Sequence, residues 1–426
     1  MASATPTTAA PSGDLRNYAL VTGAYWADTI TDGAIRVLVL FYFYERGYSP
    51  FEVASLFLFY EFFGIVTNLV GGFLAARFGL KSTLVAGLGT QTFALLSLAL
   101  APVSWLTAPY VMAAQAFSGI AKDLTKMSSK SAVKLVVPDG ASDVLFRWVA
   151  LLTGSKNALK GAGFFLGGVL LTVVGFQHAL LLLAALVVGA LFVVLTMTGG
   201  TLGKANRAAR FAQMFSNDRA INVLAAARVL LFASRDVWFV IGLPVFLRAE
   251  QHWSFWQVGA FLAVWVIGYG AVQAAAPNLL GRVSSSGTAE PTGRTATLLA
   301  FGLAAFPAGI ALALSSSLDP SLIVAFGLIA FGIAFALNSA VHSFLILDYA
   351  DGDKVAMNVG FYYTANAVGR LSGTILSGVL YQWRGFEACL WAAVAFVVGA
   401  GALSLLLPTR PPTDGSRRST DGYPLP

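Results

Sequence analysis

Charged residues are scarce in this chain of 426 amino acids. Asp, Glu, Lys and Arg make up 11% of it, while hydrophobic residues make up 57%. Soluble domains carry about 25% charged residues, so the composition excludes an ordinary soluble domain and indicates a polytopic protein of the lipid bilayer. The formal charge is +7, but the basic residues form no run with interleaved aromatics. We therefore expect no nucleic-acid partner.

Cysteine is almost absent. The single Cys389 excludes an intramolecular disulfide, and it also excludes a thiolate cluster for a soft metal or for trivalent arsenic. We expect no metal and no cofactor. A basic region followed by an apolar region, as in a signal peptide, is missing from the first 16 residues.

Long apolar segments dominate the rest of the chain. About 20 apolar residues span a bilayer, which predicts an all-α membrane protein with twelve helices, at 17–44, 50–76, 82–103, 108–134, 143–175, 178–198, 220–247, 254–280, 294–316, 321–347, 355–383 and 386–407. The predicted domains are an N-terminal cytoplasmic tail (1–16), a six-helix bundle (17–198), a basic cytoplasmic linker (199–219), a second six-helix bundle (220–407) and a disordered cytoplasmic tail (408–426).

Basic residues are distributed unevenly between the predicted loops. With the N-terminus inside, thirteen lie on the cytoplasmic side and three, Arg46, Arg248 and Arg384, lie outside. This asymmetry predicts that both termini are cytoplasmic.

The two halves repeat each other at an offset of 205 residues. Matching pairs are Glu45 and Glu250, Tyr48 and Trp253, Ser49 and Ser254, Glu52 and Gln257, Val53 and Val258, and Arg77 and Arg282. Two parallel six-helix halves joined by a cytoplasmic linker resemble the architecture of major facilitator transporters.

The loop after the second predicted helix supports this resemblance. It runs from Gly72 through Ala76, Arg77 and Gly79 to Lys81. It is similar to the loop signature of major facilitators, in which charged pairs latch helix ends and favour one gating state. Here Ala76 replaces the usual acid, which weakens the expected latch at Arg77 and Lys81. The alternative is a turn with positive-inside charges.

A second segment is rich in glycine. Gly161, Gly163, Gly167 and Gly168 resemble the antiporter signature of the family, although Phe164 stands where proline is usual. Simple helix packing explains this spacing as well as a role in transport direction does.

Several charged residues interrupt the apolar helices. Eight are basic, namely Arg36, Lys122, Lys126, Lys156, Lys160, Arg228, Arg235 and Arg370, and five are acidic, namely Asp28, Asp32, Glu61, Asp123 and Asp236. A charge inside a bilayer is costly unless it faces protein, water or a partner. The excess of cations predicts that an anion enters the interior.

The basic residues recur at helical spacing in the N-terminal half. Lys122, Lys126, Lys130 and Lys134 follow one stripe of the fourth helix, the last two near enough to the cytoplasm to snorkel, and Asp123 can neutralise one of the deeper pair. Candidate substrate-binding residues from both halves are Lys122, Lys126, Lys156, Lys160, Arg228, Arg235, Arg370 and Asn366. The alternative is internal ion pairing, of Asp32 with Arg36 and of Asp236 with Arg228 or Arg235.

Two acids are candidates for proton coupling, Asp28 and Glu61. If Glu61 has no partner, it is suited to carry a proton; beside a basic residue it is a structural counter-ion. Polar residues of the last helices can complete a pocket or hold helices together: Asn338, His342, Asn358, Tyr362, Tyr363 and Asn366.

Four longer runs, at 118–134, 146–160, 234–246 and 253–259, resemble organoarsenical efflux permeases of the ArsJ type. The resemblance implies export of 1-arseno-3-phosphoglycerate, an ester formed when glyceraldehyde-3-phosphate dehydrogenase, the functional partner, uses arsenate. Its expulsion would confer arsenate resistance. We expect a monomeric secondary carrier of the bacterial inner membrane, working by alternating access. A carrier of ordinary phosphorylated metabolites is the alternative. An enzyme acting on lipid phosphates would need a nucleophile–base pair or metal cluster, and the sequence offers neither.

Overall fold

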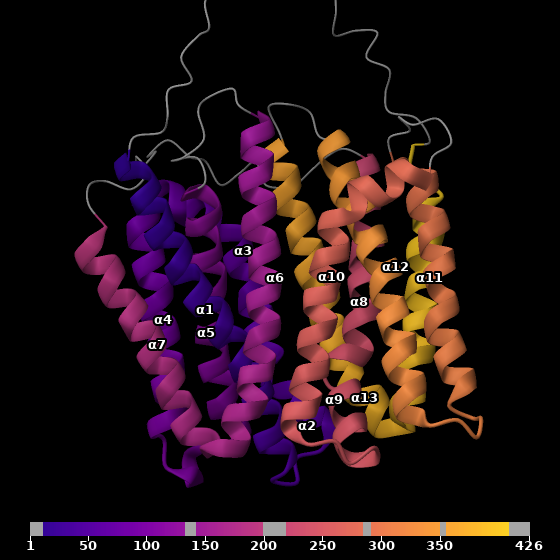
Figure 1. The fold of residues 1–426 in the computed structure, drawn as a ribbon, viewed down its shortest axis with the longest axis horizontal. Helices are drawn as coiled ribbons and strands as arrows, with labels where there is room; N and C mark the ends of the chain where they lie inside the picture. The colour runs from indigo at the N-terminus through magenta and orange to yellow at the C-terminus, as the bar shows by residue number, and fades with distance from the viewer. Residues whose placement is uncertain (1–11, 133–141, 199–218, 284–290, 350–354, 409–426) are drawn as a thin grey trace, which may run out of the picture.

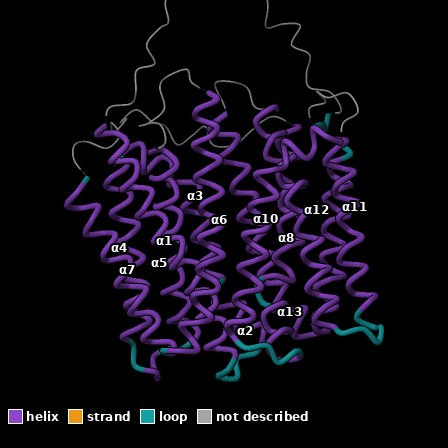
Figure 2. The backbone as a smooth tube through the Cα atoms, viewed as in Figure 1, coloured by secondary structure: helices purple, strands orange, loops and turns teal. Residues whose placement is uncertain are grey.

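The computed structural model describes residues 12–132, 142–198, 219–283, 291–349 and 355–408. In these ranges the chain consists of helices and connecting loops (Figure 2). The helices run roughly parallel to one another, the N-terminal ones on one side of the molecule and the C-terminal ones on the other (Figure 1). The predicted all-α architecture is therefore confirmed.

The described helices follow the predicted spans closely. Those of the N-terminal half are α1 (Ser12–Tyr44), α2 (Pro50–Leu56), α3 (Leu58–Phe78), α4 (Leu80–Leu100), the short η1 (Val103–Trp105), α5 (Ala108–Ala132), α6 (Ser142–Val173) and α7 (Gly175–Met197). Those of the C-terminal half are α8 (Arg219–Phe239), α9 (Gly242–Val245), η4 (Phe246–Glu250), α10 (Phe255–Val283), α11 (Gly293–Ala313), α12 (Pro320–Asp348) and α13 (Val355–Ser404).

Four predicted spans differ in detail from the observed helices. The second is divided into α2 and α3, and the seventh into α8, α9 and the π-helix η4. The last two predicted helices form one element, α13, with a kink at Arg384 and Gly385. Gly385 has φ +71° there, a backbone conformation that glycine adopts without steric cost.

Eight helical segments of the described residues are long and apolar enough to cross a membrane. One of them, Tyr362–Ser404, contains both predicted helices of α13. The other long helices, α1, α5 and α6, are interrupted by the buried charges noted above. These three helices are long enough to cross a membrane, but the charges of the candidate site make them less apolar than the other eight.

The internal repeat has a counterpart in two equivalent helix starts. The Ser49 backbone N–H donates to Glu52 Oε2 at 2.8 Å at the start of α2, and the Ser254 N–H donates to Gln257 Oε1 at 2.8 Å before α10. A side chain that reaches back in this way satisfies an N–H that the helix leaves unpaired.

Each half packs two helices closely through glycine. In α6, a Cβ at Gly163 would collide with the backbone of Ile30 and Gly33 in α1. In α13, a Cβ at Gly369 would collide with the backbone of Val229 in α8. Small residues at such crossings let helix backbones approach, which is the main source of packing energy inside a bilayer.

The glycine-rich segment of α6 lies between the two halves. Gly163 and Gly167 face α1, whereas Gly161 faces Ala263 and Gly168 faces Phe255, both of α10. The packing interpretation therefore accounts for these glycines, and a role in transport direction stays a prediction.

The two halves are closed against each other at one end, here called the Ser49 end, which carries the turns at 45–49, 250–254 and 384–385. There the Phe51 N–H donates to Gln382 at 3.2 Å, and Arg248 forms an ion pair with Glu45 at 2.9 Å. A Cβ at Gly378 would also collide with Pro50 and Ala54 of α2.

Candidate functional site

An ion-pair bridge joins the two halves within the helical region. Glu61 Oε1, on α3, accepts hydrogen bonds from Arg36 of α1 and, at 2.6 Å, from Arg370 of α13. The Glu61 side chain is 2% exposed, while those of Arg36 and Arg370 are 11% and 22% exposed. One buried carboxylate oxygen thus holds two guanidinium groups from different bundles.

Tyr60 organises the charges next to this bridge. Its hydroxyl donates a hydrogen bond to Asp32 Oδ1. The second oxygen, Asp32 Oδ2, forms an ion pair with Lys160 at 2.9 Å. The Arg36 guanidinium lies 4.4 Å from the centre of the Tyr60 ring, and the Lys122 ammonium lies 4.1 Å from it. Both cations are therefore close enough to the ring to be attracted by its π electrons.

The pairing of Asp32 with Arg36, which the sequence offered as an alternative to substrate binding, is not found. Asp32 binds Lys160 of α6, and Arg36 binds Glu61 of α3. Spacing along one helix favours the local pair, but the packing of α1 against α3 and α6 offers each group a nearer partner.

Asp123 lies between the two deep lysines of α5. It forms an ion pair with Lys126, and the Lys122 ammonium lies 3.8 Å from its second oxygen. Lys126 also donates to Asn68 of α3 at 2.5 Å. One acid is thus shared by two lysines.

Asp28, the second candidate for proton coupling, is as deeply buried as Glu61. Both residues are 1% exposed, and Asp28 Oδ2 accepts a hydrogen bond from Thr125 at 2.6 Å. Its Oδ1 is buried without a hydrogen-bond partner among the described residues. Glu61, by contrast, has the two arginines, which corresponds to the counter-ion alternative.

In the C-terminal half, Asp236 forms ion pairs with two arginines. It pairs with its neighbour Arg235 at 2.5 Å, and Arg370 Nε lies 3.7 Å from its other oxygen. This is one of the two pairings predicted for Asp236.

Arg228 has no carboxylate partner within 4 Å in the described part of the chain. It is 3% exposed, and it donates to Asn366 Oδ1 at 2.7 Å and to the Ser339 carbonyl at 3.0 Å. Asn338 and His342 of α12 are fully buried, and their polar side-chain atoms have no hydrogen-bond partner there. This group combines a buried cation with unused donors and acceptors.

Ion pairs at the candidate site are shared. Six basic residues form ion pairs with only four carboxylates. The basic residues are Arg36, Lys122, Lys126, Lys160, Arg235 and Arg370, and the acidic ones are Asp32, Glu61, Asp123 and Asp236. The six side chains remain between 11% and 22% exposed. They keep a positive excess and can exchange partners with an oxyanion.

The remaining predicted residues lie elsewhere. Lys156 is partly exposed on α6. Lys81 donates to the Thr198 carbonyl at 2.9 Å, which joins α4 to the end of α7 within one bundle. The side chains of Arg77, Lys130 and Asn358, and the whole of Lys134, lie outside the described residues, as do most of the predicted linker and tails.

Sequence reasoning missed several uncharged members of the site. They are Tyr60, Asn68, Ser339, Tyr269 and Gln273, the last two of which contact the Ser339 hydroxyl. Tyr60 and Asn68 share α3 with Glu61. Polar residues on the helix that carries a predicted buried acid are the signal that could have found them.

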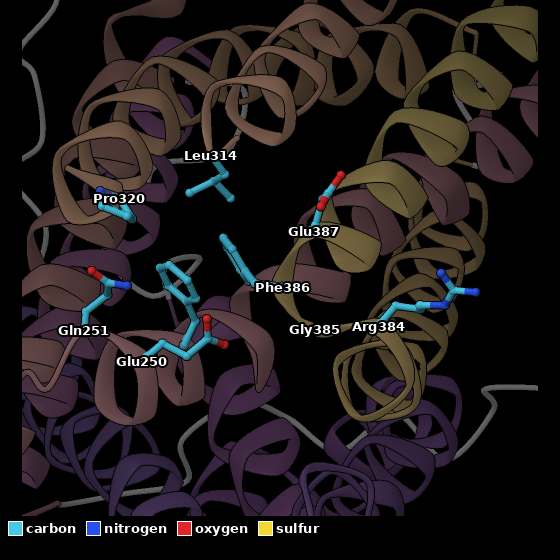
Figure 3. Close-up of a pocket in the computed structure, with 9 residues that line it drawn as sticks. Glu250, Gln251, Leu314, Pro320, Arg384, Gly385, Phe386 and Glu387 are labelled. Atoms are coloured by element: carbon cyan, nitrogen blue, oxygen red, sulfur yellow. The ribbon is translucent and has the colours of Figure 1, made fainter. Parts of the chain in front are cut away.

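A pocket of about 300 Å³ lies away from these charges, at the Ser49 end of the C-terminal half (Figure 3). Glu250, Gln251 and Pro320 line one part of it, and Phe386 and Glu387 of α13 line another. It contains none of the predicted substrate-binding residues. Among the described residues, no group of three or more His, Cys, Asp or Glu side chains could hold a metal ion.

Known proteins resemble the chain at three levels. The profile of the Major Facilitator Superfamily matches residues 21–369 and 292–426. A crystal structure of a D-xylose–proton symporter superimposes with a TM-score of 0.70 over 93% of this chain and 98% of that one, at 14% sequence identity. A Na⁺, Li⁺, K⁺/H⁺ antiporter of Planococcus maritimus is 31% identical over 128 residues.

The antiporter match spans 30% of this chain and 29% of the relative's length. The symporter match, at low identity, carries the fold alone. The family profile, in contrast, extends over most of the chain and both halves. Together with the apolar membrane-spanning helices, it establishes that the chain is a membrane transporter and belongs to the major facilitator superfamily.

Proposed function

We propose that this transporter is a secondary active exporter of a small polyanion with phosphate or arsenate groups, working by alternating access. The proposed cargo is 1-arseno-3-phosphoglycerate, and its export would confer arsenate resistance. One observation supports the proposal: six basic side chains from both bundles share four carboxylates, and one of these ion pairs, between Glu61 and Arg370, joins the two halves.

A dianion fits this arrangement for an electrostatic reason. Arginine grips phosphate-like oxygens with two parallel hydrogen bonds, and lysine supplies a point charge. Arg370 and Arg228 come from one half, Arg36 and Lys160 from the other. An anion with charged groups at both ends can contact both halves at once, and its binding then favours the conformations that bring them together.

The direction of transport follows from the charge asymmetry of the loops. We place both termini in the cytoplasm of a bacterium, so the closed Ser49 end faces outward. In this proposal the cargo reaches the basic side chains from the cytoplasm, which is the loading side of an exporter. Asp28, with its unpartnered buried oxygen, is the better candidate for a proton-coupling group.

Cation–proton antiport is a second candidate, suggested by the relative from Planococcus maritimus. The charge of the interior argues against it. Eight basic residues outnumber five acidic ones in the helical segments, so a metal cation would meet net repulsion there. Among the described residues, Asp28 Oδ1 and Asp123 Oδ2 are the buried carboxylate oxygens without a hydrogen-bond partner. Lys122 lies 3.8 Å from the second, so these two oxygens are a poor cage for a hard cation.

Ordinary phosphorylated metabolites are the alternative cargo, because a phosphate presents the same oxygens as an arsenate. The likeness of residues 118–134 and 146–160 to organoarsenical permeases favours the arsenic conjugate. Glyceraldehyde-3-phosphate dehydrogenase would then be the functional partner that supplies the cargo.

Transport into everted membrane vesicles tests the cargo. Vesicles with the transporter receive labelled arsenate, glyceraldehyde-3-phosphate, the dehydrogenase and its nicotinamide cofactor. We expect label to enter only when all components are present, and transporter-free vesicles are the control. Uptake from arsenate alone at the same rate would contradict the conjugate as cargo. Strong competition by 3-phosphoglycerate would instead favour the phosphorylated-metabolite alternative.

A further inference from the structure

The bridge at Glu61 has the geometry of a bound oxyanion. A single oxygen, Oε1, accepts from the guanidinium of Arg36 and from that of Arg370, at 2.6 Å for the latter. Arginine binds the oxygens of phosphate and arsenate with the same N–H groups. The carboxylate of Glu61 therefore occupies donors that an anionic cargo would need.

Glu61 and Arg370 belong to different bundles, α3 and α13. Their ion pair thus forms or breaks when the bundles move relative to each other. Asp236 cannot take this role, because it shares the C-terminal bundle with Arg370, lies 3.7 Å from it and already binds Arg235 at 2.5 Å. Of the acids that contact Arg370 in the described residues, Glu61 is the one that links the halves.

The bridge has a consequence for the empty carrier. Without Glu61, the departure of cargo would leave Arg36 with no carboxylate partner and Arg370 with Asp236 alone, at 3.7 Å. A buried charge without its partner is strongly unfavourable. Glu61 neutralises both, so the halves can close around an unloaded site. A carrier without such an internal anion closes readily only when loaded, and it is then limited to exchanging one anion for another.

We propose that Glu61 takes the place of the cargo between Arg36 and Arg370 during the return of the empty carrier, so that the protein performs net export and is not restricted to exchange. This inference rests on the proposed function, since it requires an anionic cargo. It also makes Glu61 a competitor of that cargo for the two arginines.

Net export and exchange are measured separately in proteoliposomes that contain the purified protein. For net export, the arsenic-labelled conjugate is generated by the dehydrogenase on one side only. For exchange, it is generated on both sides, with label on one. For Glu61→Gln we expect net export to fall by about 10-fold or more, because two buried cations lose their partner. Exchange should stay within about 3-fold of wild type, because the loaded carrier does not use Glu61.

A second readout distinguishes this role from a structural one. Removing an internal competitor should lower the conjugate concentration that half-saturates exchange, by about 3-fold or more. Glu45→Gln is the matched control, because it breaks another ion pair between the halves, at the exposed Ser49 end. We expect that variant to resemble wild type in both modes.

Three results would overturn the inference. They are net export by Glu61→Gln at the wild-type rate, loss of both modes in a folded Glu61→Gln protein, and an unchanged half-saturating concentration. If Glu61→Gln does not fold, Glu61→Asp replaces it; its shorter side chain should slow net export more than exchange, and equal slowing of both overturns the inference. Failure of the wild type to transport the conjugate at all would instead contradict the proposed function.

Discussion

The two bundles pack alike but differ in charge. In each bundle a glycine lets two helix backbones pack in close contact, Gly163 in the N-terminal half and Gly369 in the C-terminal half. Among the interrupting charges, the N-terminal helices carry five basic and four acidic residues, whereas the C-terminal helices carry three arginines and one acid, Asp236. The packing follows the repeat and the charges do not, which indicates that the scaffold was kept while the binding surface diverged.

This difference assigns unequal tasks to the halves. The N-terminal bundle nearly neutralises its own cations, through Asp32, Asp123 and Glu61. The C-terminal bundle leaves Arg228 with an amide and a carbonyl as partners. We therefore expect the C-terminal half to contribute more of the attraction for an anion, and Glu61 to reach across to it when the site is empty.

The largest expected effect tests the similarity in packing. Gly163→Val and Gly369→Val place a branched side chain against the backbone of a neighbouring helix, and overpacking of this kind costs about 1–3 kcal/mol or more. We expect both variants to lose most of the folded protein. The amount of monodisperse protein after detergent extraction measures this.

Matched controls for these variants exist in both halves. Nothing lies within 4 Å of a Cβ at Gly189 or Gly302, so Gly189→Val and Gly302→Val should extract normally. Normal yields of Gly163→Val or Gly369→Val would show that the crossings tolerate a wider separation and that the halves do not depend on the same packing.

A smaller effect tests the difference in charge. Arg228→Ala should raise the half-saturating cargo concentration or lower the transport rate by about 10- to 100-fold, since a hydrogen bond to a charged group contributes about 1.5–3 kcal/mol. Lys126→Ala should change either quantity by about 3-fold or less, because Asp123 already neutralises much of its charge. Initial rates in everted vesicles provide both numbers.

Arg228→Lys serves as the control for this comparison, because it keeps the charge and loses the planar donor set. It should retain part of the activity that Arg228→Ala loses. If Lys126→Ala proves as harmful as Arg228→Ala in folded protein, the two bundles contribute equally and the proposed asymmetry is wrong.

The smallest effect concerns the closed end. Glu45 and Arg248 are 44% and 30% exposed and join the halves there. Exposed ion pairs contribute about 0–1 kcal/mol, so Arg248→Gln should shift the thermal midpoint and the transport rate only slightly. Thermal unfolding in detergent at low and high salt measures it. A large loss would mean that this pair, and not the apolar contact of Gly378 with α2, keeps the end closed.

The sequence predicted the positions of the helices with little error, and it singled out the charged residues that pair with one another in the structure. Spans are local, because about 20 apolar residues in a row cross a bilayer wherever they occur. Buried charges are conspicuous for the same reason, since each interrupts an apolar run. The uncharged members, such as Tyr60 and Ser339, escaped because a single polar residue in a helix is common and has many uses.

Partner choice was harder to predict. The i,i+4 spacing of Asp32 and Arg36 favoured a local pair, but Lys160 and Glu61, from other helices, are the partners found. The role of the glycines in α6 was likewise ambiguous from the sequence. The structure shows that two of them pack against α1 and two against α10.

The sequence by itself determined that the chain crosses a membrane many times, that it repeats, and that its interior holds more basic than acidic groups. Hydropathy and charge belong to each residue and need no knowledge of its neighbours. Only the tertiary structure decided that one oxygen of Glu61 holds arginines from both halves, because contacts between helices far apart in the chain depend on how those helices cross.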